Sequence, residues 1–453
     1  METKEVVALQ RSYFLSNQTK KLAFRKDMLN RLYSVIKKNE NEILLALHKD
    51  LGKSRTEGYM TEVSILYGEI RNARKNLEHW ARPKRVPGTL ATFPAANYIY
   101  KEPYGVTLIL APWNYPFNLS MAPLVGAISA GNTALIKCSK SSIHTAKLIQ
   151  KLINENFPAK YLYCVDPEAD YDDVISRKYD YIFFTGSPGV GKTIMRAASE
   201  HLTPVSLELG GKSPCFVDRH ANLRVAAKRI VWGKFLNAGQ TCISIDYVLV
   251  DEAVREGLIG YLKQEINKKY ANAQDMEGYP NIINRHHFER LKGLIERAGE
   301  VWGGASNEAA KKIAPAIIPH ASFDQEIMEE EIFGPILPII GYTDLEQTIA
   351  TVKERNKPLA CYIFTERKAY ADKINAEVSF GGGCVNDVIM HVSNHHMPFG
   401  GVGNSGMGGY HGKYSFDTFS HTKSVVKNIT AVDIPLRYPP FDEAKLSFLK
   451  KFI

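Results

Sequence analysis

Three segments of the sequence carry residue types that could do covalent chemistry. Cys242 lies in NAGQTCIS, just beyond an expected helix, where free backbone N–H groups could hold the oxyanion that a nucleophilic thiol creates. Glu208 lies in LELGGK, after an expected strand, where a carboxylate of raised pKa could activate water against a thioester. Asn114 lies in APWNYP, where two prolines fix the turn and the amide could be a second oxyanion donor.

Each of these residues also has an ordinary structural interpretation. A lone cysteine is usually a small buried hydrophobe, and the other five cysteines suit that description. A glutamate in a strand is more often at the surface or in an ion pair, and Asn114 alone could be only a turn residue. The segments therefore gain their meaning from occurring together.

A fourth segment, residues 183–193 (FFTGSPGVGKT), satisfies the phosphate-loop pattern G-x-x-x-x-G-K-[ST]. The context fits an ATP site, because residues 179–184 (YDYIFF) are expected to be a strand and residues 194–201 could be the following helix. The strand expected at residues 247–252 (YVLVDE) ends in acidic residues that could hold magnesium. This motif by itself predicts an ATPase, and the rest of the chain must decide.

Composition indicates a multidomain globular protein. The chain has 453 residues and 45% hydrophobic residues, enough for two or three domains with sizeable cores. The net charge of +9 comes from basic residues spread along the chain, which favours a solvated surface with some attraction for anionic ligands over nucleic-acid binding.

The cysteine pattern and the termini bear on the cellular setting. The six cysteines are scattered without a C-x-x-C pair or zinc spacing, so we expect no metal site and a reduced, cytoplasmic location. The N-terminus lacks the apolar core of a signal peptide, and no run approaches the roughly 18 apolar residues of a membrane span. The tail KLSFLKKFI is basic and apolar; it could touch a membrane surface but is better interpreted as a docked tail.

The order of apolar runs predicts an α/β architecture. Residues 5–80 have helical spacing and few candidate catalytic groups, and residues 82–92 break that pattern before a strand at residues 96–100. The runs VTLILAPWNYP, GNTALIKCS, KYLYCVD and YDYIFFTGS then alternate with helix-length segments, which indicates a parallel sheet that binds nucleotides at the strand C-terminal ends. Further strands and helices, to about residue 380, predict a second α/β domain, and two glycine-rich segments follow as expected loops.

At this point the sequence strongly resembles the aldehyde dehydrogenase superfamily. The shared signatures are PWNYP, GNTALIK, FTGS followed by G, LELGGK, GQTC, EEIFGP and PFGG, in the same order over nearly the whole chain. TPVSLELGGKSPC and the terminal RYPPF resemble the class 3 branch, which acts on medium-chain aliphatic and aromatic aldehydes. Several long motifs in register are far more specific than one phosphate loop.

The resemblance implies a Rossmann-type cofactor domain, a second α/β catalytic domain and a small β oligomerisation element. We expect NAD(P) binding in residues 1–81 and 101–206, and catalysis in residues 207–384. Residues 82–100 and 385–453 resemble the bridging segments that pair subunits by extending a sheet, which predicts a homodimer.

The resemblance also implies a mechanism. Cys242 would attack the aldehyde carbon, and the side-chain N–H of Asn114 with the backbone N–H of Cys242 would hold the oxyanion. Hydride transfer to the nicotinamide would leave a thioester, and Glu208 would activate the water that releases a carboxylic acid.

The cofactor, NAD or NADP, would contact a separate set of residues. Gly186 and Ser187 would open a helix N-terminus that receives the pyrophosphate, so the ATP motif would be accidental. Many NAD-using relatives carry a ribose-binding Glu where this chain has Lys140, which predicts that NADP is used at least as well as NAD unless Lys140 simply points to solvent. Lys137 and Glu331 match positions that bind the two riboses, and Phe333 matches one that packs near the nicotinamide. Trp113, and Gly191 in the phosphate motif, complete the expected cofactor-binding set.

Three rival functions remain at this stage. An acylating enzyme of the same fold would pass the acyl group to coenzyme A or phosphate, but Glu208 as a placed base favours hydrolysis. The ATPase and a catalytically silent relative are the other two, and intact Cys242, Glu208 and Asn114 argue against silence. Trp113, Tyr115 and Tyr59 suggest an aromatic-lined entrance that favours apolar aldehydes, although the aldehyde itself is not determined.

Overall fold

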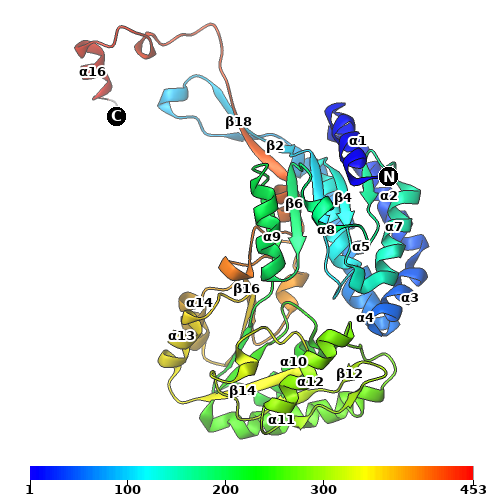
Figure 1. Ribbon diagram of the computed structural model, residues 1–453. Coiled ribbons are helices and arrows are strands. Elements are labelled where there is room, and N and C mark those ends of the chain that lie inside the picture. Colours follow the sequence, from blue (N-terminus) through cyan, green and yellow to red (C-terminus); the bar gives the residue numbers. More distant parts are fainter. Residues whose placement is uncertain (452–453) are drawn as a thin grey trace.

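The computed structural model describes residues 1–451, which form two α/β lobes and an arm that leaves the body (Figure 1). The first lobe is built on a six-stranded sheet of order β17-β7-β6-β3-β4-β5, parallel except for β17. Strands such as VTLIL are buried on both faces, which is why they are continuously apolar rather than alternating. The strands are β3 Val106–Leu110, β4 Thr133–Lys137, β5 Leu162–Cys164, β6 Tyr181–Thr185, β7 Val205–Glu208 and β17 Gly406–Met407.

Helices cover both faces of this sheet. The helix α6 (Asn118–Ala130) is buried along its whole length, which fits a sequence that is apolar all round. A short helix and a π-helical turn, α4 (Arg55–Gly58) and Tyr59–Val63, join the N-terminal helices to α5. The other helices of this lobe are α1 Thr3–Leu15, α2 Leu22–Lys38, α3 Glu40–Leu51, α5 Ser64–Ala81, α7 Ile143–Asn156, α8 Tyr171–Ile175 and α9 Pro188–Ser199.

The second lobe has a seven-stranded sheet of order β10-β13-β14-β9-β8-β15-β16, parallel except at the β10 edge. The two α/β units expected from the alternating pattern are therefore confirmed. The strands are β8 Pro214–Val217, β9 Tyr247–Asp251, β10 Trp302–Gly303, β13 Ala316–Ile318, β14 Ile336–Tyr342, β15 Ala360–Phe364 and β16 Gly382–Val385; a hairpin of β11 Ser306–Asn307 and β12 Lys312–Ile313 and the helices α10 Leu223–Phe235, α11 Arg255–Tyr270, α12 Arg285–Arg297, α13 Leu345–Glu354 and α14 Lys368–Glu377 complete it.

The run VSLELGGKSPCFV divides between the lobes. Its first half is β7 in the first sheet and its second half is β8 in the second sheet, so the two glycines lie where the chain crosses over. β17, at residues 406–407, pairs with β7, so part of the segment expected to bridge subunits belongs to the first sheet. Glu208 thus lies at the junction of the lobes, on the last position of β7.

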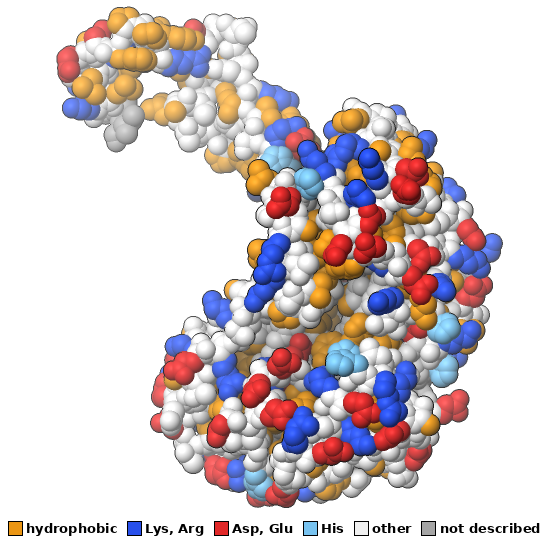
Figure 2. All heavy atoms as spheres, viewed as in Figure 1, with side chains coloured by type: hydrophobic (Ala, Val, Ile, Leu, Met, Phe, Trp, Pro, Cys, Tyr) orange, Lys and Arg blue, Asp and Glu red, His pale blue; other side chains and the backbone are white. Residues whose placement is uncertain are grey.

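The arm is a three-stranded antiparallel sheet of order β1-β2-β18, continued by the C-terminal tail. Figure 2 shows hydrophobic side chains gathered over this tail, whereas acidic and basic side chains are interspersed on the visible face of both lobes. No helix within residues 1–451 is long and apolar enough to span a membrane. The last two residues of KLSFLKKFI lie outside the described part. The elements of the arm and its tail are β1 Lys84–Val86, β2 Ala96–Pro103, β18 Ser420–Lys427 and α16 Glu443–Leu449, whereas α15 Lys413–Thr418 packs against α6 of the first lobe.

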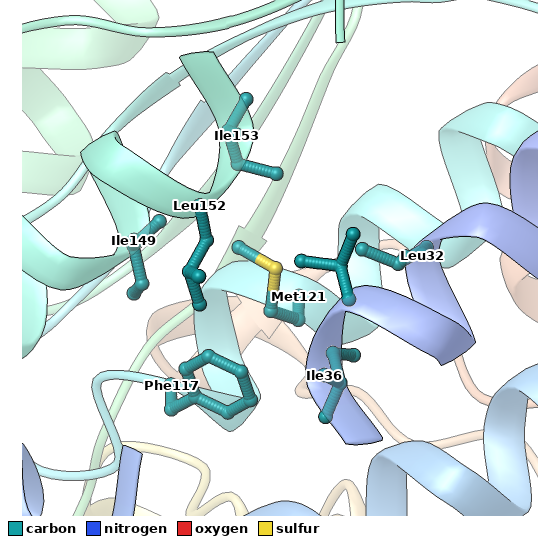
Figure 3. Close-up of a pocket in the computed structure, with 8 residues that line it drawn as sticks. Leu32, Ile36, Phe117, Met121, Ile149, Leu152 and Ile153 are labelled. Carbon is teal, nitrogen blue, oxygen red and sulfur yellow. The ribbon is translucent and has the colours of Figure 1, made fainter. Parts of the chain in front are cut away.

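A small apolar gap lies among α2, α6 and α7, close to the start of α6 (Figure 3). Leu32 and Met121 face it from α2 and α6, and Ile149 and Leu152 face it from α7. This packing fixes the position of α6, which begins just after the PWNYP turn.

We expect Leu32→Ala to lower the free energy of unfolding by roughly 2–5 kcal/mol, because it removes buried methyl groups and enlarges an existing gap. Leu45→Ala is the matched control, since Leu45 is 51% exposed, and its change should stay within about 0.5 kcal/mol. The urea midpoint followed by far-ultraviolet circular dichroism measures both variants. Equal shifts for the two would show that the gap does not matter to stability.

Candidate active site

The loop that carries Cys242 is held in an unusual backbone conformation. Asn237, Ala238 and Gly239 have φ values of 54°, 52° and 74°, three consecutive left-handed residues of which only the last is glycine. Such backbone costs free energy and persists only where surrounding contacts fix it. The contacts are present: the Asn237 backbone N–H donates to Glu57 Oε1 at 2.8 Å, and Gln240 Nε2 donates to the Asn237 carbonyl at 3.1 Å.

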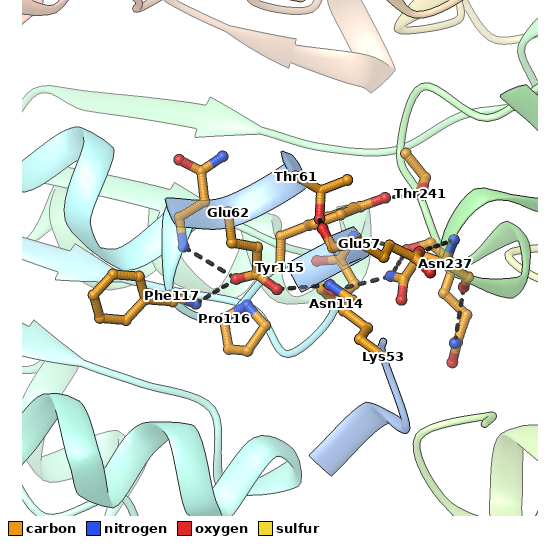
Figure 4. A network of polar contacts seen from close by, with 12 residues as sticks. Lys53, Glu57, Thr61, Glu62, Asn114, Tyr115, Pro116, Phe117, Asn237 and Thr241 are labelled. Atoms are coloured by element: carbon orange, nitrogen blue, oxygen red, sulfur yellow. Dashed lines mark hydrogen bonds and ion pairs between the residues drawn. The ribbon is translucent and has the colours of Figure 1, made fainter. Parts of the chain in front are cut away.

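Asn114 reaches this loop from the first lobe. Its side-chain Nδ2 donates to the Gln240 backbone carbonyl at 3.1 Å, and Asn114 is only 3% exposed (Figure 4). Its own backbone carbonyl accepts from Lys53 Nζ at 3.0 Å and from Asn237 Nδ2 at 2.9 Å. Because an amide nitrogen has two hydrogens, Asn114 keeps one for a further acceptor.

Cys242 is half-buried at the end of the strained loop. Burial raises the pKa of its thiol to about 12, and the nearby carboxyl groups of Glu331 and Glu208 add to this rise, while the backbone N–H groups of Cys242 and Ile243 oppose it. In this state the sulfur is a neutral thiol at pH 7. Backbone N–H groups directed at the sulfur are also suited to stabilise negative charge that develops beside it.

Glu208 is a buried carboxyl group without a partner. It is 3% exposed, and neither of its carboxylate oxygens has a hydrogen-bond donor within the described residues. Burial raises its pKa well above the usual range. An unpaired buried carboxyl group is costly for folding, so its presence points to chemistry. The backbone holds it on both sides, since Gly406 lies opposite Glu208 in the β17–β7 pair and the Gly186 N–H donates to the Glu208 carbonyl at 3.0 Å.

Glu331 fits against the glycine turn of LELGGK. A Cβ on Gly210 would lie 2.0 Å from Glu331 Oε2, so this contact requires glycine. Burial, aided by the charge of Asp246, raises the pKa of Glu331 to about 8, whereas a hydrogen bond from the Gly211 N–H lowers it. The neighbouring Lys234 is 1% exposed, and burial lowers its pKa to about 8.

The aromatic residues expected near the nicotinamide lie together. Phe333 packs edge-on against Trp113 with ring centroids 5.4 Å apart, and it has a φ of 48°, a left-handed value that is rare for a bulky residue. The Trp113 ring also contacts the imidazole ring of His287 on α12, with ring centroids 5.5 Å apart. Burial lowers the pKa of His287 to about 4, so this imidazole is neutral at pH 7.

The residues expected to bind the dinucleotide lie along the C-terminal ends of the first sheet. Ser187 is the N-cap of α9, and Gly191 with the rest of the GVGKT sequence lies inside that helix. A Cβ at Gly189 would meet nothing within 4 Å, so open space adjoins the first turn of α9, as phosphate binding at a helix N-terminus requires. Lys137 ends β4, and burial lowers the pKa of its amine; Lys140, exposed, lies on the next short helical turn, Lys140–Ser142.

Three further residues were missed by the sequence interpretation, which expected few functional groups in the N-terminal helices. Lys53, Glu57 and Glu62 form buried or partly buried polar contacts with the loops of Asn114 and Asn237. Their only sequence signal is charge within an otherwise apolar helical pattern, and charged residues at such positions are usually solvated. Lys212 was also missed as a contact of the EEEIFGP loop: its Nζ donates to the carbonyls of Ile327 at 2.9 Å and Glu330 at 2.7 Å.

Comparison with known proteins agrees with this geometry. The family model described as "Aldehyde dehydrogenase family" matches residues 2–425. The relative 4,4'-diaponeurosporen-aldehyde dehydrogenase of Staphylococcus aureus is 47% identical and the match covers 98% of this chain and 97% of that protein. Two proteins of Rattus norvegicus are each 42% identical: aldehyde dehydrogenase family 3 member A2 (98% of this chain, 92% of that protein) and aldehyde dehydrogenase, dimeric NADP-preferring (96% and 97%).

A solved structure, the substrate-bound state of Staphylococcus aureus AldH, has a TM-score of 0.96 and 45% identity, covering 99% of both chains. The α/β fold and the class 3 resemblance predicted from the sequence motifs are thereby confirmed. With a family model matched over most of its length and relatives above 40% identity, this chain belongs to the aldehyde dehydrogenase family.

Proposed function

We propose that the chain oxidises apolar aldehydes to carboxylic acids with NAD or NADP, through a covalent thioester on Cys242. The observation that carries this proposal is the convergence of three residues from distant parts of the sequence. Asn114 donates to Gln240, two positions before Cys242, and the Glu208 carboxyl group lies near enough to raise the pKa of the Cys242 thiol. A nucleophile, an oxyanion donor and a base thus share one water-poor site.

In the first step the Cys242 sulfur attacks the aldehyde carbon. A carbon–sulfur bond forms, the carbonyl π pair moves to oxygen, and the thiol proton passes to water. The oxyanion accepts hydrogen bonds from the remaining Asn114 amide N–H and from the backbone N–H of Cys242. Because the thiol pKa is about 12 in this state, proton loss must accompany attack or follow a change in the surroundings of the sulfur.

A nicotinamide held in this site would supply the hydride acceptor for the next step. The oxyanion electrons would then re-form the carbonyl group as the carbon–hydrogen bond breaks, and the acyl group would stay on Cys242 as a thioester. We assign the pyrophosphate contact to Gly186 and Ser187, with Gly191 in the same helix, and one ribose contact to Lys137, from their places at the C-terminal edge of the first sheet. We assign the other ribose contact to Glu331 and the nicotinamide side to Phe333, on the loop before β14, with Trp113 packed against Phe333.

Glu208 completes the reaction. Its carboxylate takes a proton from water, the water oxygen bonds to the acyl carbon, and the carbon–sulfur bond breaks to release the acid and the Cys242 thiolate. A base of raised pKa is well matched to this step, because it binds the proton firmly at the moment of attack. A placed hydrolytic base favours this route over acyl transfer to coenzyme A or phosphate.

Aromatic side chains favour apolar substrates. Tyr115, which follows Asn114 in the turn, is buried, and Trp113 directly precedes Asn114. Tyr59 is 41% exposed. The relative from Staphylococcus aureus is named for an aldehyde, 4,4'-diaponeurosporen-aldehyde, and it supports an aldehyde substrate for this chain.

Lys140 favours NADP. Its ammonium is exposed beside Lys137, whose pKa it lowers, so two cations lie near the end of β4. A 2′-phosphate would add charge-assisted contacts there. One relative is named as NADP-preferring, which supports this assignment.

The arm supports a homodimer. β18 and β1 are edge strands of the arm sheet, β16 is an edge strand of the second sheet, and Val426 on β18 is 55% exposed. Pairing of such edges between two copies would cover them.

The proposal also divides the chain into cofactor-binding segments (1–81, 101–206), a catalytic segment (207–384) and bridging segments (82–100, 385–453). It includes a cytoplasmic location, which the six free cysteines support.

The first test mixes the enzyme with NAD or NADP and a panel of aliphatic and aromatic aldehydes while reduced cofactor is followed by absorbance. We expect reduction by the wild type and none by Cys242→Ala, which lacks the nucleophile. Magnesium-dependent ATP hydrolysis without aldehyde oxidation would instead restore the phosphate-loop interpretation of residues 183–193.

Glu208→Gln should separate the two halves of the reaction. We expect a rapid burst of reduced cofactor followed by turnover that is slower by about 10²–10⁴-fold, because thioester hydrolysis loses its base. Wild-type hydrolysis should rise with pH as Glu208 loses its proton, since only the carboxylate accepts one from water, and this rise should be absent in the variant. Stopped-flow absorbance across pH measures both; a variant without a burst would contradict the assignment.

Lys140→Glu should lower kcat/KM for NADP relative to NAD by about tenfold or more, because a carboxylate replaces the ammonium near the 2′-phosphate. Lys147→Glu on α7 is the control, since it changes the net charge equally from another exposed position. An unchanged cofactor ratio in Lys140→Glu, or a strong wild-type preference for NAD, would remove Lys140 from the cofactor site.

Light scattering at micromolar concentration should give about twice the chain mass of 50.8 kDa. Removal of residues 428–453 tests whether the exposed tail contributes to pairing beyond the strands. A monodisperse monomer for the intact chain would contradict the homodimer.

A further inference from the structure

A fully buried ion pair lies behind the Asn114 turn. Lys53 Nζ and Glu62 Oε1 are 2.6 Å apart, and both side chains have an exposure of 0% (Figure 4). Lys53 follows α3, and Glu62 lies in the π-helical turn before α5. A buried pair of this kind adds little to stability compared with apolar residues of similar size.

The remaining bonds of the pair end on the turn itself. Lys53 Nζ also donates to the Asn114 backbone carbonyl at 3.0 Å and lies 4.0 Å from the centre of the Tyr115 ring. Glu62 Oε2 accepts from the backbone N–H groups of Phe117 at 2.9 Å and Asn118 at 3.2 Å, at the start of α6. The pair therefore holds residues 114–118 from both sides, as Figure 4 shows.

This arrangement fixes Asn114 at two points. Lys53 and Asn237 hold its backbone carbonyl, and the Gln240 carbonyl holds one of its amide hydrogens. With both points fixed, the second amide N–H can take only a narrow range of directions. An oxyanion donor displaced by about 1 Å can cost on the order of 100-fold in rate.

We propose that Lys53 and Glu62 are positioning residues for the oxidation reaction, which aim the Asn114 amide at the oxyanion. They touch neither substrate nor cofactor and act through the backbone of the turn. The inference rests on the proposed function of Asn114 as an oxyanion donor. It extends the functional site to the N-terminal helical region, where the sequence predicted few candidate catalytic groups.

The test uses the double variant Lys53→Met/Glu62→Gln in the full-length enzyme. It leaves no unpaired buried charge, and the glutamine oxygen can still accept from the Phe117 and Asn118 N–H groups, so folding should be retained. We expect kcat to fall about 10–100-fold, while the Kd of the cofactor and the rate of Cys242 alkylation by iodoacetamide change less than about twofold.

A double-mutant cycle with Asn114→Ala separates positioning from general structure. Without the Asn114 amide, the same double exchange should lower kcat by less than about threefold, because its route of action is gone. An equal loss in both backgrounds would overturn the proposal in favour of a general structural role. If kcat falls in Asn114→Ala but not in the double variant, the positioning role of Lys53 and Glu62 is overturned. The oxyanion role of Asn114 would stand.

Arg25→Met is the matched control. Arg25 is another buried cation that donates to backbone carbonyls, those of Thr19 at 3.1 Å and of Ser129 at 3.2 Å near the far end of α6. It should lower the unfolding midpoint without lowering kcat of the folded enzyme. If Asn114→Ala leaves kcat unchanged, both the oxyanion assignment and this inference fail, whereas loss of oxidation in Cys242→Ala would still support the thioester route.

Discussion

The hydrogen bond from Asn114 Nδ2 to the Gln240 carbonyl is the contact on which the proposed site depends, because it joins the Asn114 turn of one lobe to the Cys242 loop of the other. One lobe supplies an amide on a rigid turn, and the other supplies a thiol on a strained loop. Neither sheet contains a complete site. The left-handed backbone before Cys242 is tolerated because the first lobe supports it, through Glu57 as well as through Asn114.

Burial sets the protonation of the proposed site and makes it costly to fold. Desolvation keeps Cys242 as a thiol and Glu208 with a raised pKa, and neither carboxylate oxygen of Glu208 has a protein donor within the described residues. An ion pair to Glu208 would stabilise the folded protein but would lower the pKa of this carboxyl group. Glu208 would then be a weaker base for thioester hydrolysis. The large apolar cores on both sheets offset this cost.

The phosphate-loop match illustrates how context changes the meaning of a motif. Gly191, Lys192 and Thr193 of the motif lie within α9. Only Gly186 and Ser187, before the helix, lie at the sheet edge where a phosphate can bind. The Gly186 N–H is bonded to the Glu208 carbonyl, so this turn also helps to place the strand that carries Glu208. In the proposed site, one segment would therefore serve both the cofactor and the base.

The sequence by itself determined the two α/β lobes and the family, because buried parallel strands are continuously apolar and the motifs around Cys242, Glu208 and Asn114 are long. The roles of these three residues are what those motifs predict. The sequence did not show that residues 205–217 divide between two sheets, and it assigned no role to Lys53, Glu57 or Glu62. Only the tertiary structure decided these points. The run divides because two glycines let the chain cross between sheets. The three charged residues gain partners from loops more than 50 positions away for Lys53 and Glu62 and more than 100 for Glu57. Such contacts leave no periodic signal, since a buried ion pair differs from a surface one only in what the fold packs around it.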